Sequence, residues 1–131
     1  MSTSNPTLTW IREFGSGAGA ADHAEDLAAD AFGNVYITGN SRGKIGDDDH
    51  SGKHDAYLAK IGLHGNLDWI EQVGSTGNDF AHGVVTDSYG HIYICGHTDG
   101  EKAEGQKRGS IDSWIAKYAP DGTRIWLKQI G

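Results

Sequence analysis

The sequence predicts an all-β protein made of two consecutive repeats, each with four short antiparallel strands. Three observations predict this. A tryptophan-headed motif recurs at a nearly fixed interval, short β-branched runs alternate with turns that end in glycine, and no window shows the apolar spacing of an amphipathic helix. The 20 glycines and 2 prolines among 131 residues agree with a chain that turns often.

The repeat is marked by similar hexapeptides that begin at Trp10, Trp69 and Trp126, 59 and then 57 residues apart. The two-residue difference lies where Ser16–Ala29 is longer than Ser75–Thr86, which indicates a loop there. Elsewhere the second copy follows the first without a gap. We therefore expect a single segment over residues 1–131, with a first repeat over 7–74 and a second over 75–131.

Each copy contains four predicted strands, separated by turn residues. They are 26–30, 34–39, 55–61 and 66–73 in the first copy, and 83–87, 91–96, 112–118 and 123–130 in the second. The turns 31–33, 63–65, 88–90 and 120–122 each end in glycine, which suits a tight hairpin. A helix over the alanine-rich stretch 18–31 is the alternative, but the equivalent stretch 77–88 contains Val84, Val85 and Thr86 and favours a strand.

Four antiparallel strands repeated at this interval are typical of β-propeller blades. Neighbouring blades cover both faces of a blade, which explains near-continuous apolar runs such as 35–37 and 92–95. A compact sandwich of eight or nine strands is the alternative, but it gives no reason for two halves in register. Because Leu8–Gly15 repeats the last strand of a copy, we expect nine strands where two blades need eight.

The motifs also resemble a known family. The first copy reads Gly-Asn-Val-Tyr-Ile-Thr-Gly at 33–39, Asp-Ala-Tyr-Leu-Ala-Lys at 55–60 and Gly-Asn-Leu-Asp-Trp at 65–69, and the second copy echoes these at 90–96, 112–117 and 121–126. This pattern is similar to SBBP, the bacterial seven-bladed beta-propeller repeat, over nearly the whole chain from Thr7. The resemblance implies a propeller fold and brings no catalytic residue set. Members commonly carry many repeats, whereas this chain carries two.

Two blades on their own would expose an apolar face on each outer side. We therefore expect copies of the chain to complete a closed ring, preferably a homotrimer of six blades and next a homotetramer of eight. One of the duplicate strands, Leu8–Gly15 or Thr123–Gly131, is expected near the junction between copies. An engineered or fragmentary propeller fits the same pattern.

The long connections are predicted to gather at one end of the blades. They are Ser16–Glu25, Asn40–His54, Ser75–His82 and His97–Ile111. Loops on a rigid scaffold are the usual place for a ligand, so the candidate ligand residues are His23, Glu25, Phe80, His82 and His97. A ligand-free scaffold is preferred over a multivalent, lectin-like module, because Phe80 is the one Phe, Tyr or Trp in these connections.

The densest set of possible metal ligands is Asp47, Asp48, Asp49 and His50, followed by His54. This run lacks the glycine and the final glutamate of an EF-hand loop, and the second copy does not repeat it. A solvated acidic loop is therefore preferred, and no metal or cofactor is expected.

Other residues are interpreted as structural. Asp55 and its equivalent Asp112 each begin a strand, where a carboxylate can accept hydrogen bonds from loop amides. Trp10, Trp69 and Trp126 share one repeat position and are interpreted as packing between blades.

Charge and the remaining motifs exclude several function classes. Eleven basic and 18 acidic residues give a net charge of −7, which disfavours nucleic acid and anionic membranes as partners. The start of the sequence lacks the pattern of a secretory signal, so a chain expressed as it stands is expected in the cytoplasm. The histidines do not recur between copies and no Gly-x-Ser-x-Gly motif occurs, so an enzyme is not expected. Cys95 is a single cysteine and has no intrachain disulfide partner.

Overall fold

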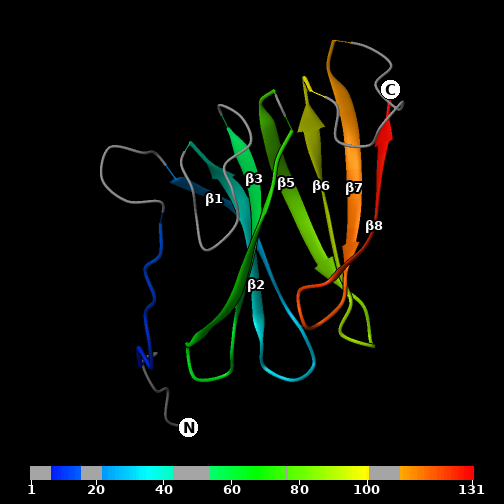
Figure 1. Cartoon of the computed structure of the whole chain (residues 1–131). Helices are drawn as coiled ribbons and strands as arrows, with labels where there is room; N and C mark the ends of the chain where they lie inside the picture. The colour runs from blue at the N-terminus through cyan, green and yellow to red at the C-terminus, as the bar shows by residue number, and fades with distance from the viewer. Residues whose placement is uncertain (1–6, 16–21, 43–53, 76, 101–109) are drawn as a thin grey trace, which may run out of the picture.

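The computed structural model describes residues 7–15, 22–42, 54–75, 77–100 and 110–131. They form two four-stranded antiparallel sheets with the strands in chain order (Figure 1), so the predicted all-β architecture is confirmed. Within these ranges no helix has the length and apolar character that crossing a membrane would require. Blade 1 contains β1 (Asp22–Ala29), β2 (Val35–Ser41), β3 (Asp55–Ile61) and β4 (Leu67–Val73), and blade 2 contains β5 (Asp79–Thr86), β6 (Ile92–Thr98), β7 (Asp112–Tyr118) and β8 (Arg124–Ile130).

Both blades share one register, including a bulge in the first strand. The β1–β2 register shifts around Glu25, between Ala24 and Asp26, and the β5–β6 register shifts around His82 at the equivalent point. The predicted starts of these strands, at residues 26 and 83, were wrong. A bulge interrupts the alternation of apolar and polar residues, so the pattern was recognised only beyond it. The connections predicted over Ser16–Glu25 and Ser75–His82 are correspondingly shorter.

Residues 7–15, which contain the expected ninth strand Leu8–Gly15, form no strand. They run along the outside of blade 1 (Figure 1). The prediction was wrong because a β-strand needs the backbone of a neighbouring strand to pair with. The counterpart of this segment, β4, pairs with β3, and in the described part of the chain no such neighbour pairs with residues 7–15.

The short hairpin turns lie together at the lower end in Figure 1. The first turn of each blade repeats one set of hydrogen bonds. Asp30 Oδ1 accepts from the backbone N–H groups of Phe32 and Asn34 at 2.9 and 3.0 Å. Asp87 Oδ1 accepts from the equivalent two donors of its own turn at the same distances. Gly65 and Gly122 close the other two hairpins at φ of 86° and 93°, a backbone region that other residues rarely adopt.

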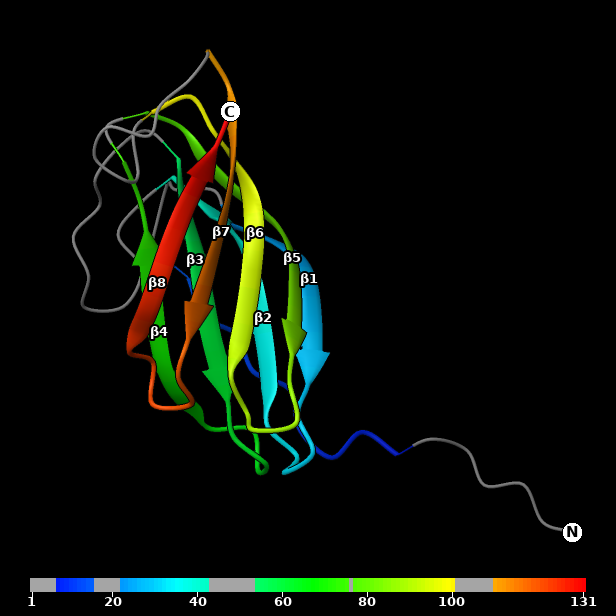
Figure 2. The same ribbon diagram turned by 90° about the vertical axis from the view of Figure 1, so that its right-hand side faces the viewer.

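The two blades pack face to face and come closest at their first strands, with β5 contacting β1, β2 and β3 (Figure 2). The core between them takes one face from each blade. Burying each large apolar side chain there contributes roughly 1.5–3 kcal/mol. This core contains Tyr36, Ala56, Leu58 and Val73 from blade 1 and Ala81, Val84, Ile92, Ile94, Trp114, Ala116 and Tyr118 from blade 2, with Ala28, Trp69 and Leu127 packed against it.

Candidate functional site

Each blade has an outer face that points away from the other blade, and the two outer faces lie on opposite sides of the blade pair. Successive residues of a strand point to opposite faces, so the residues next to those of the inter-blade core point outward. The blade 1 outer face contains Ile37, Tyr57, Ala59 and Ile70. The blade 2 outer face contains Val85, Tyr93, Cys95, Ile115 and Trp126.

Side chains of the blade 2 outer face reach the surface of the molecule. Val85 is 60% exposed and the Cys95 thiol is also exposed. Both residues line a shallow apolar hollow of about 180 Å³ together with Tyr93 and Ile115. The Tyr93 ring meets the Trp126 ring at a centroid distance of 6.3 Å. This face therefore presents aromatic and aliphatic groups to the surroundings.

The same positions in blade 1 are covered by blade 2. Tyr36, Thr38 and Leu58 stand 57 residues before Tyr93, Cys95 and Ile115, and each is 0% exposed. The repeat thus places one kind of face on both blades, and within the described ranges another blade packs on this face in blade 1 only.

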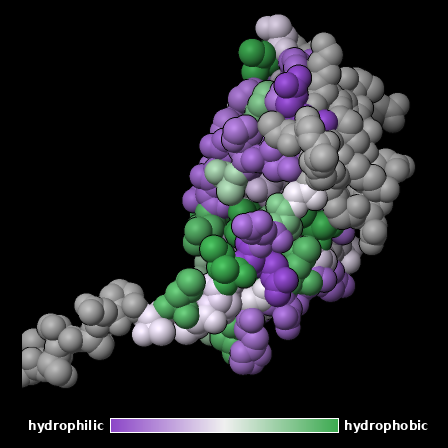
Figure 3. All heavy atoms as spheres, turned by 90° about the vertical axis from the view of Figure 1, so that its left-hand side faces the viewer, coloured by the Kyte–Doolittle hydropathy of each residue, from purple (hydrophilic) through white to green (hydrophobic). Residues whose placement is uncertain are grey.

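The blade 1 outer face is covered in part. Tyr57 and Ala59 are buried there, with Ile37, Ile70 and Phe14 packed against them. Their counterparts in blade 2 are Trp114, Ala116, Ile94 and Leu127, which belong to the inter-blade core. Figure 3 shows this side of the molecule, where apolar groups gather beside the N-terminal segment.

The Tyr57 phenol illustrates the environment of this face. Burial, together with the charges of Asp22 and Glu25, raises the pKa of Tyr57 to about 12. The hydroxyl therefore remains protonated at neutral pH, and it donates a hydrogen bond to the His23 carbonyl oxygen at 3.1 Å.

Polar contacts fix how one blade sits on the next. Trp69 Nε1 and Lys60 Nζ both donate to the Pro120 carbonyl oxygen at 3.0 Å. Asn40 Oδ1 accepts from the backbone N–H of Ala81 at 2.9 Å. The equivalents of Trp69, Lys60 and Asn40 on blade 2 are Trp126, Lys117 and His97, so the outer face keeps groups able to hydrogen-bond at all three positions.

Another contact of the junction lacks a counterpart on the blade 2 outer face. Asp26 Oδ2 accepts from the backbone N–H of Val84 at 2.9 Å. The residue that corresponds to Asp26 in blade 2 is Gly83, which has no side-chain acceptor.

The end with the long connections holds buried carboxylates that serve the fold. Asp79 accepts hydrogen bonds from the Ser75 backbone N–H at 2.6 Å and from Thr98 Oγ1 at 2.6 Å. Asp55 and Asp112, the two aspartates singled out in the sequence, are buried as well. Asp112 Oδ2 accepts a hydrogen bond from Gln129 Nε2 at 3.0 Å. Gln129 belongs to β8, the outer strand of blade 2. Asp79 and Asp112 therefore accept hydrogen bonds from other residues of blade 2.

Three of the five candidate ligand residues form a row of rings at that end, and a fourth ring joins them. Phe80 stacks on His97 at 4.8 Å, and His97 stacks on His82 at 4.8 Å, with His82 Nε2 and His97 Nδ1 2.7 Å apart. The His54 ring also lies against Phe80, with the ring centroids 5.2 Å apart. Partial burial, with the neighbouring His82, lowers the pKa of His97. His97 is therefore largely neutral at pH 7.

The other two candidates lie apart from this row, on β1 of blade 1. His23 contributes its carbonyl oxygen to Tyr57, and Glu25 lines a hollow together with Leu27 and Ile37. The sequence analysis assigned all five candidates to the long connections, but all five lie on strands: His23 and Glu25 on β1, Phe80 and His82 on β5, and His97 on β6. The role of His54 in the row was missed, because it depends on how one blade packs on the other.

The candidate metal ligands Asp47, Asp48, Asp49 and His50 lie outside the described residues, and His54 is the one member that is described. Its ring faces Phe80. In the described ranges no three His, Cys, Asp or Glu side chains come together as a metal-binding group.

Comparison with protein families gives one finding and comparison with characterised proteins gives none. The model of SBBP, a beta-propeller repeat, matches residues 9–47 and 68–101, which together make up more than half of the chain. A search of curated proteins found no match.

Proposed function

The chain belongs to the SBBP beta-propeller repeat family, and from this premise we propose that it is a non-catalytic building block that assembles with further copies of itself into a closed propeller. The blade 2 outer face of one copy packs on the blade 1 outer face of the next. Such a head-to-tail contact closes into a ring when the rotation per copy fits. Three copies give six blades, and four copies give eight.

The observation that supports this proposal is the correspondence between the two outer faces and the junction inside the chain. Tyr93, Ile115 and Trp126 repeat Tyr36, Leu58 and Trp69, which contribute one side of that junction. Tyr57 and Ala59 repeat Trp114 and Ala116, which contribute the other. A second copy would pack on each outer face with the same kind of surface that forms the junction between the two blades of one chain.

The experiment compares two exposed residues of blade 2. Val85→Glu places a charge on the blade 2 outer face, whereas Tyr89→Glu places the same charge on a hairpin turn, where Tyr89 is also exposed. Sedimentation velocity is expected to show assembly for the wild type and Tyr89→Glu, and its loss for Val85→Glu. Equal sedimentation of all three as single chains would contradict the proposal.

A second candidate function is ligand binding at the row formed by His54, Phe80, His97 and His82. Stacked rings at the surface suit the apolar face of a sugar, and a ring of copies would repeat the site and gain avidity. The test is a titration with simple methyl glycosides, followed by NMR of the histidine ring protons. Saturable shifts that disappear in Phe80→Ala would support this function, and unchanged spectra at millimolar sugar would contradict it.

A further inference from the structure

The N-terminal segment, residues 7–15, sits on blade 1 as the outer strand of a preceding blade would. A Cβ atom added at Gly65 would lie 2.8 Å from Trp10 Cδ2, and one added at Gly122 would lie 3.0 Å from Trp69 Cδ2. Each tryptophan therefore presses on the glycine turn between the third and fourth strands of the blade that follows it. Trp10 therefore has the same position relative to blade 1 that Trp69 has relative to blade 2.

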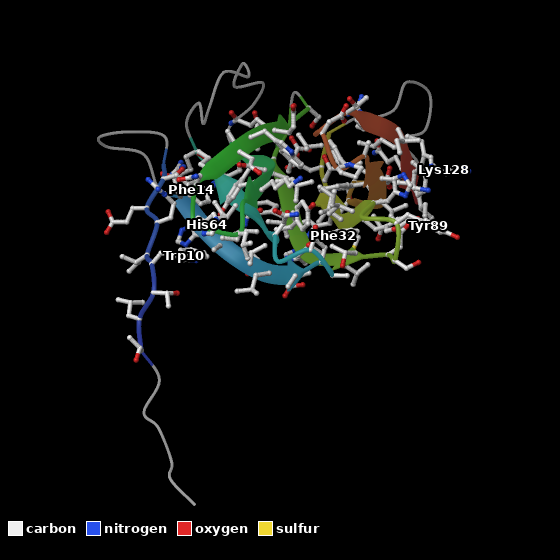
Figure 4. All side chains as sticks on the ribbon, turned by 90° about the horizontal axis from the view of Figure 1, so that it is seen from below. Trp10, Phe14, Phe32, His64, Tyr89 and Lys128 are labelled. Atoms are coloured by element: carbon white, nitrogen blue, oxygen red, sulfur yellow. The ribbon has the colours of Figure 1, made fainter. Side chains whose placement is uncertain are left out.

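A second contact has the same correspondence. Phe14 packs edge-on against Tyr57, with ring centroids 5.8 Å apart and an angle of 84° between the planes. At the junction between the blades, the equivalents of these two residues, Val73 and Trp114, lie in the same core. Viewed from the hairpin-turn end, Trp10 and Phe14 lie together at the blade 1 side, and Lys128 of β8 lies at the opposite end (Figure 4).

The segment is also tied by a hydrogen bond, but it lacks the support of a complete blade. Arg12 Nε donates to the Gly65 carbonyl oxygen at 2.8 Å. Leu8 and Ile11, in contrast, are 77% and 76% exposed. Among the described residues, no strand pairs with the segment, whereas β8 is paired with β7 along its length. The segment therefore covers the face with less apolar area than a whole blade would.

We infer that residues 7–15 and the β8 strand of a second copy compete for the same site on the blade 1 outer face. This inference rests on the proposed function. In the assembly, β8 of the neighbour takes the place that β4 takes inside the chain, and that place is the one the segment fills. Two backbones cannot occupy it together, so the segment must leave before a second copy docks. The segment thus acts as an intramolecular competitor that sets the concentration at which the chain assembles.

The first experiment weakens the segment without removing it. Trp10→Ala with Phe14→Ala deletes the two rings that touch blade 1, and Leu8→Ala with Ile11→Ala is the matched control on the exposed side of the same segment. Sedimentation equilibrium is expected to give an association constant for the first variant about tenfold higher than wild type. The control is expected to match the wild type. Circular dichroism checks that both variants keep their strands.

The second experiment uses the wild-type chain, so it is decisive even if the double variant does not fold. Trypsin cleaves after Arg12, which the segment holds against the Gly65 turn in the single chain. Cleavage is expected to become several-fold faster once the chains associate, because docking releases the segment.

The outcomes separate the two proposals. Slower cleavage after Arg12 in the associated state, or a lower association constant for Trp10→Ala with Phe14→Ala, would make the segment part of the junction. An unchanged association constant would show that the segment has no role in assembly. Each of these results would overturn the competition while assembly stands. No association by any of the chains would instead overturn the proposed function.

Discussion

The two blades present the same face with opposite degrees of burial. Leu58 of blade 1 is fully buried against blade 2, whereas its counterpart Ile115 lines an open hollow on the blade 2 outer face. Val73 is likewise buried, and its counterpart Ile130 is exposed. The residue types are alike, so the difference comes from the presence or absence of a following blade. A repeat defines a surface, and the neighbour determines whether that surface becomes core.

On the other side of the molecule, the residue of blade 2 is buried and its counterpart in blade 1 is exposed. Val84 of blade 2 is 4% exposed because it faces blade 1, but its counterpart Leu27 is 64% exposed. The N-terminal segment shields Tyr57 and leaves Leu27 open. The segment therefore covers less of the blade 1 outer face than a whole blade would. This agrees with the proposal that a blade of a second copy displaces the segment.

The largest expected effect comes from truncating equivalent residues in the two blades. Leu58→Ala should lower the free energy of unfolding by about 2–5 kcal/mol, because it leaves a cavity in the core between the blades. Ile115→Ala should cost less than half as much in dilute solution, where a single chain leaves this position partly open. Urea unfolding at low chain concentration measures both values. Equal losses would show that the two faces are not differently covered.

A smaller effect is expected from the polar contact that bridges the blades. Asn40→Ala removes the acceptor of the Ala81 N–H and leaves that donor buried, which should cost about 1–3 kcal/mol in unfolding free energy. The matched variant is His97→Ala at the equivalent position of blade 2, and its cost in dilute solution should be smaller. If the two variants had the same stability, Asn40 would not be bridging the blades.

The alkylation rate of the exposed Cys95 thiol shows whether another copy covers the blade 2 outer face. Alkylation of Cys95 should be rapid in dilute solution, because the thiol is exposed in the single chain. When nine-tenths of the chains are associated, the rate should fall about tenfold, because only the free chains present the thiol. Val85→Glu serves as the control and should remove this protection. A labelling rate independent of chain concentration would place Cys95 outside any contact between copies.

The smallest effect is a pH dependence confined to blade 2. The pKa of His97 is lowered from 6.5 by burial and by His82, and Asp99 partly opposes the shift. The unfolded chain therefore takes up a proton before the folded chain does, so stability should fall as the pH drops below about 6.5. His97→Asn, which restores the residue type of blade 1, should flatten this dependence between pH 7.5 and 5.5. A decline of the same size in that variant would assign the dependence to other groups.

The sequence predicted the architecture well, because each element has a local cause that appears twice. The turn aspartates and the glycines that close the hairpins recur 57 residues apart, and the tryptophan motifs recur 59 and then 57 residues apart. Each copy therefore supports the interpretation of the other. The starts of β1 and β5 could not be placed, because bulges at Glu25 and His82 break the alternation that identifies a strand.

The candidate site was harder to predict, because it depends on what lies between the blades. Nothing local brings His54 to Phe80, since the two belong to different blades. The N-terminal segment repeats a strand sequence and yet forms no strand, because pairing depends on a neighbour that the sequence pattern does not specify. Which of two equivalent faces is buried likewise follows from the packing of whole blades.

The central claim is that the outer faces of separate copies join as the two blades of one chain do. Light scattering coupled to size-exclusion chromatography tests it most directly, because it gives the molar mass without a standard of known shape. The expected result is a species of three or four times the 14.0 kDa chain mass at micromolar concentration. A well-folded species that stays at 14.0 kDa as the concentration is raised would contradict the claim.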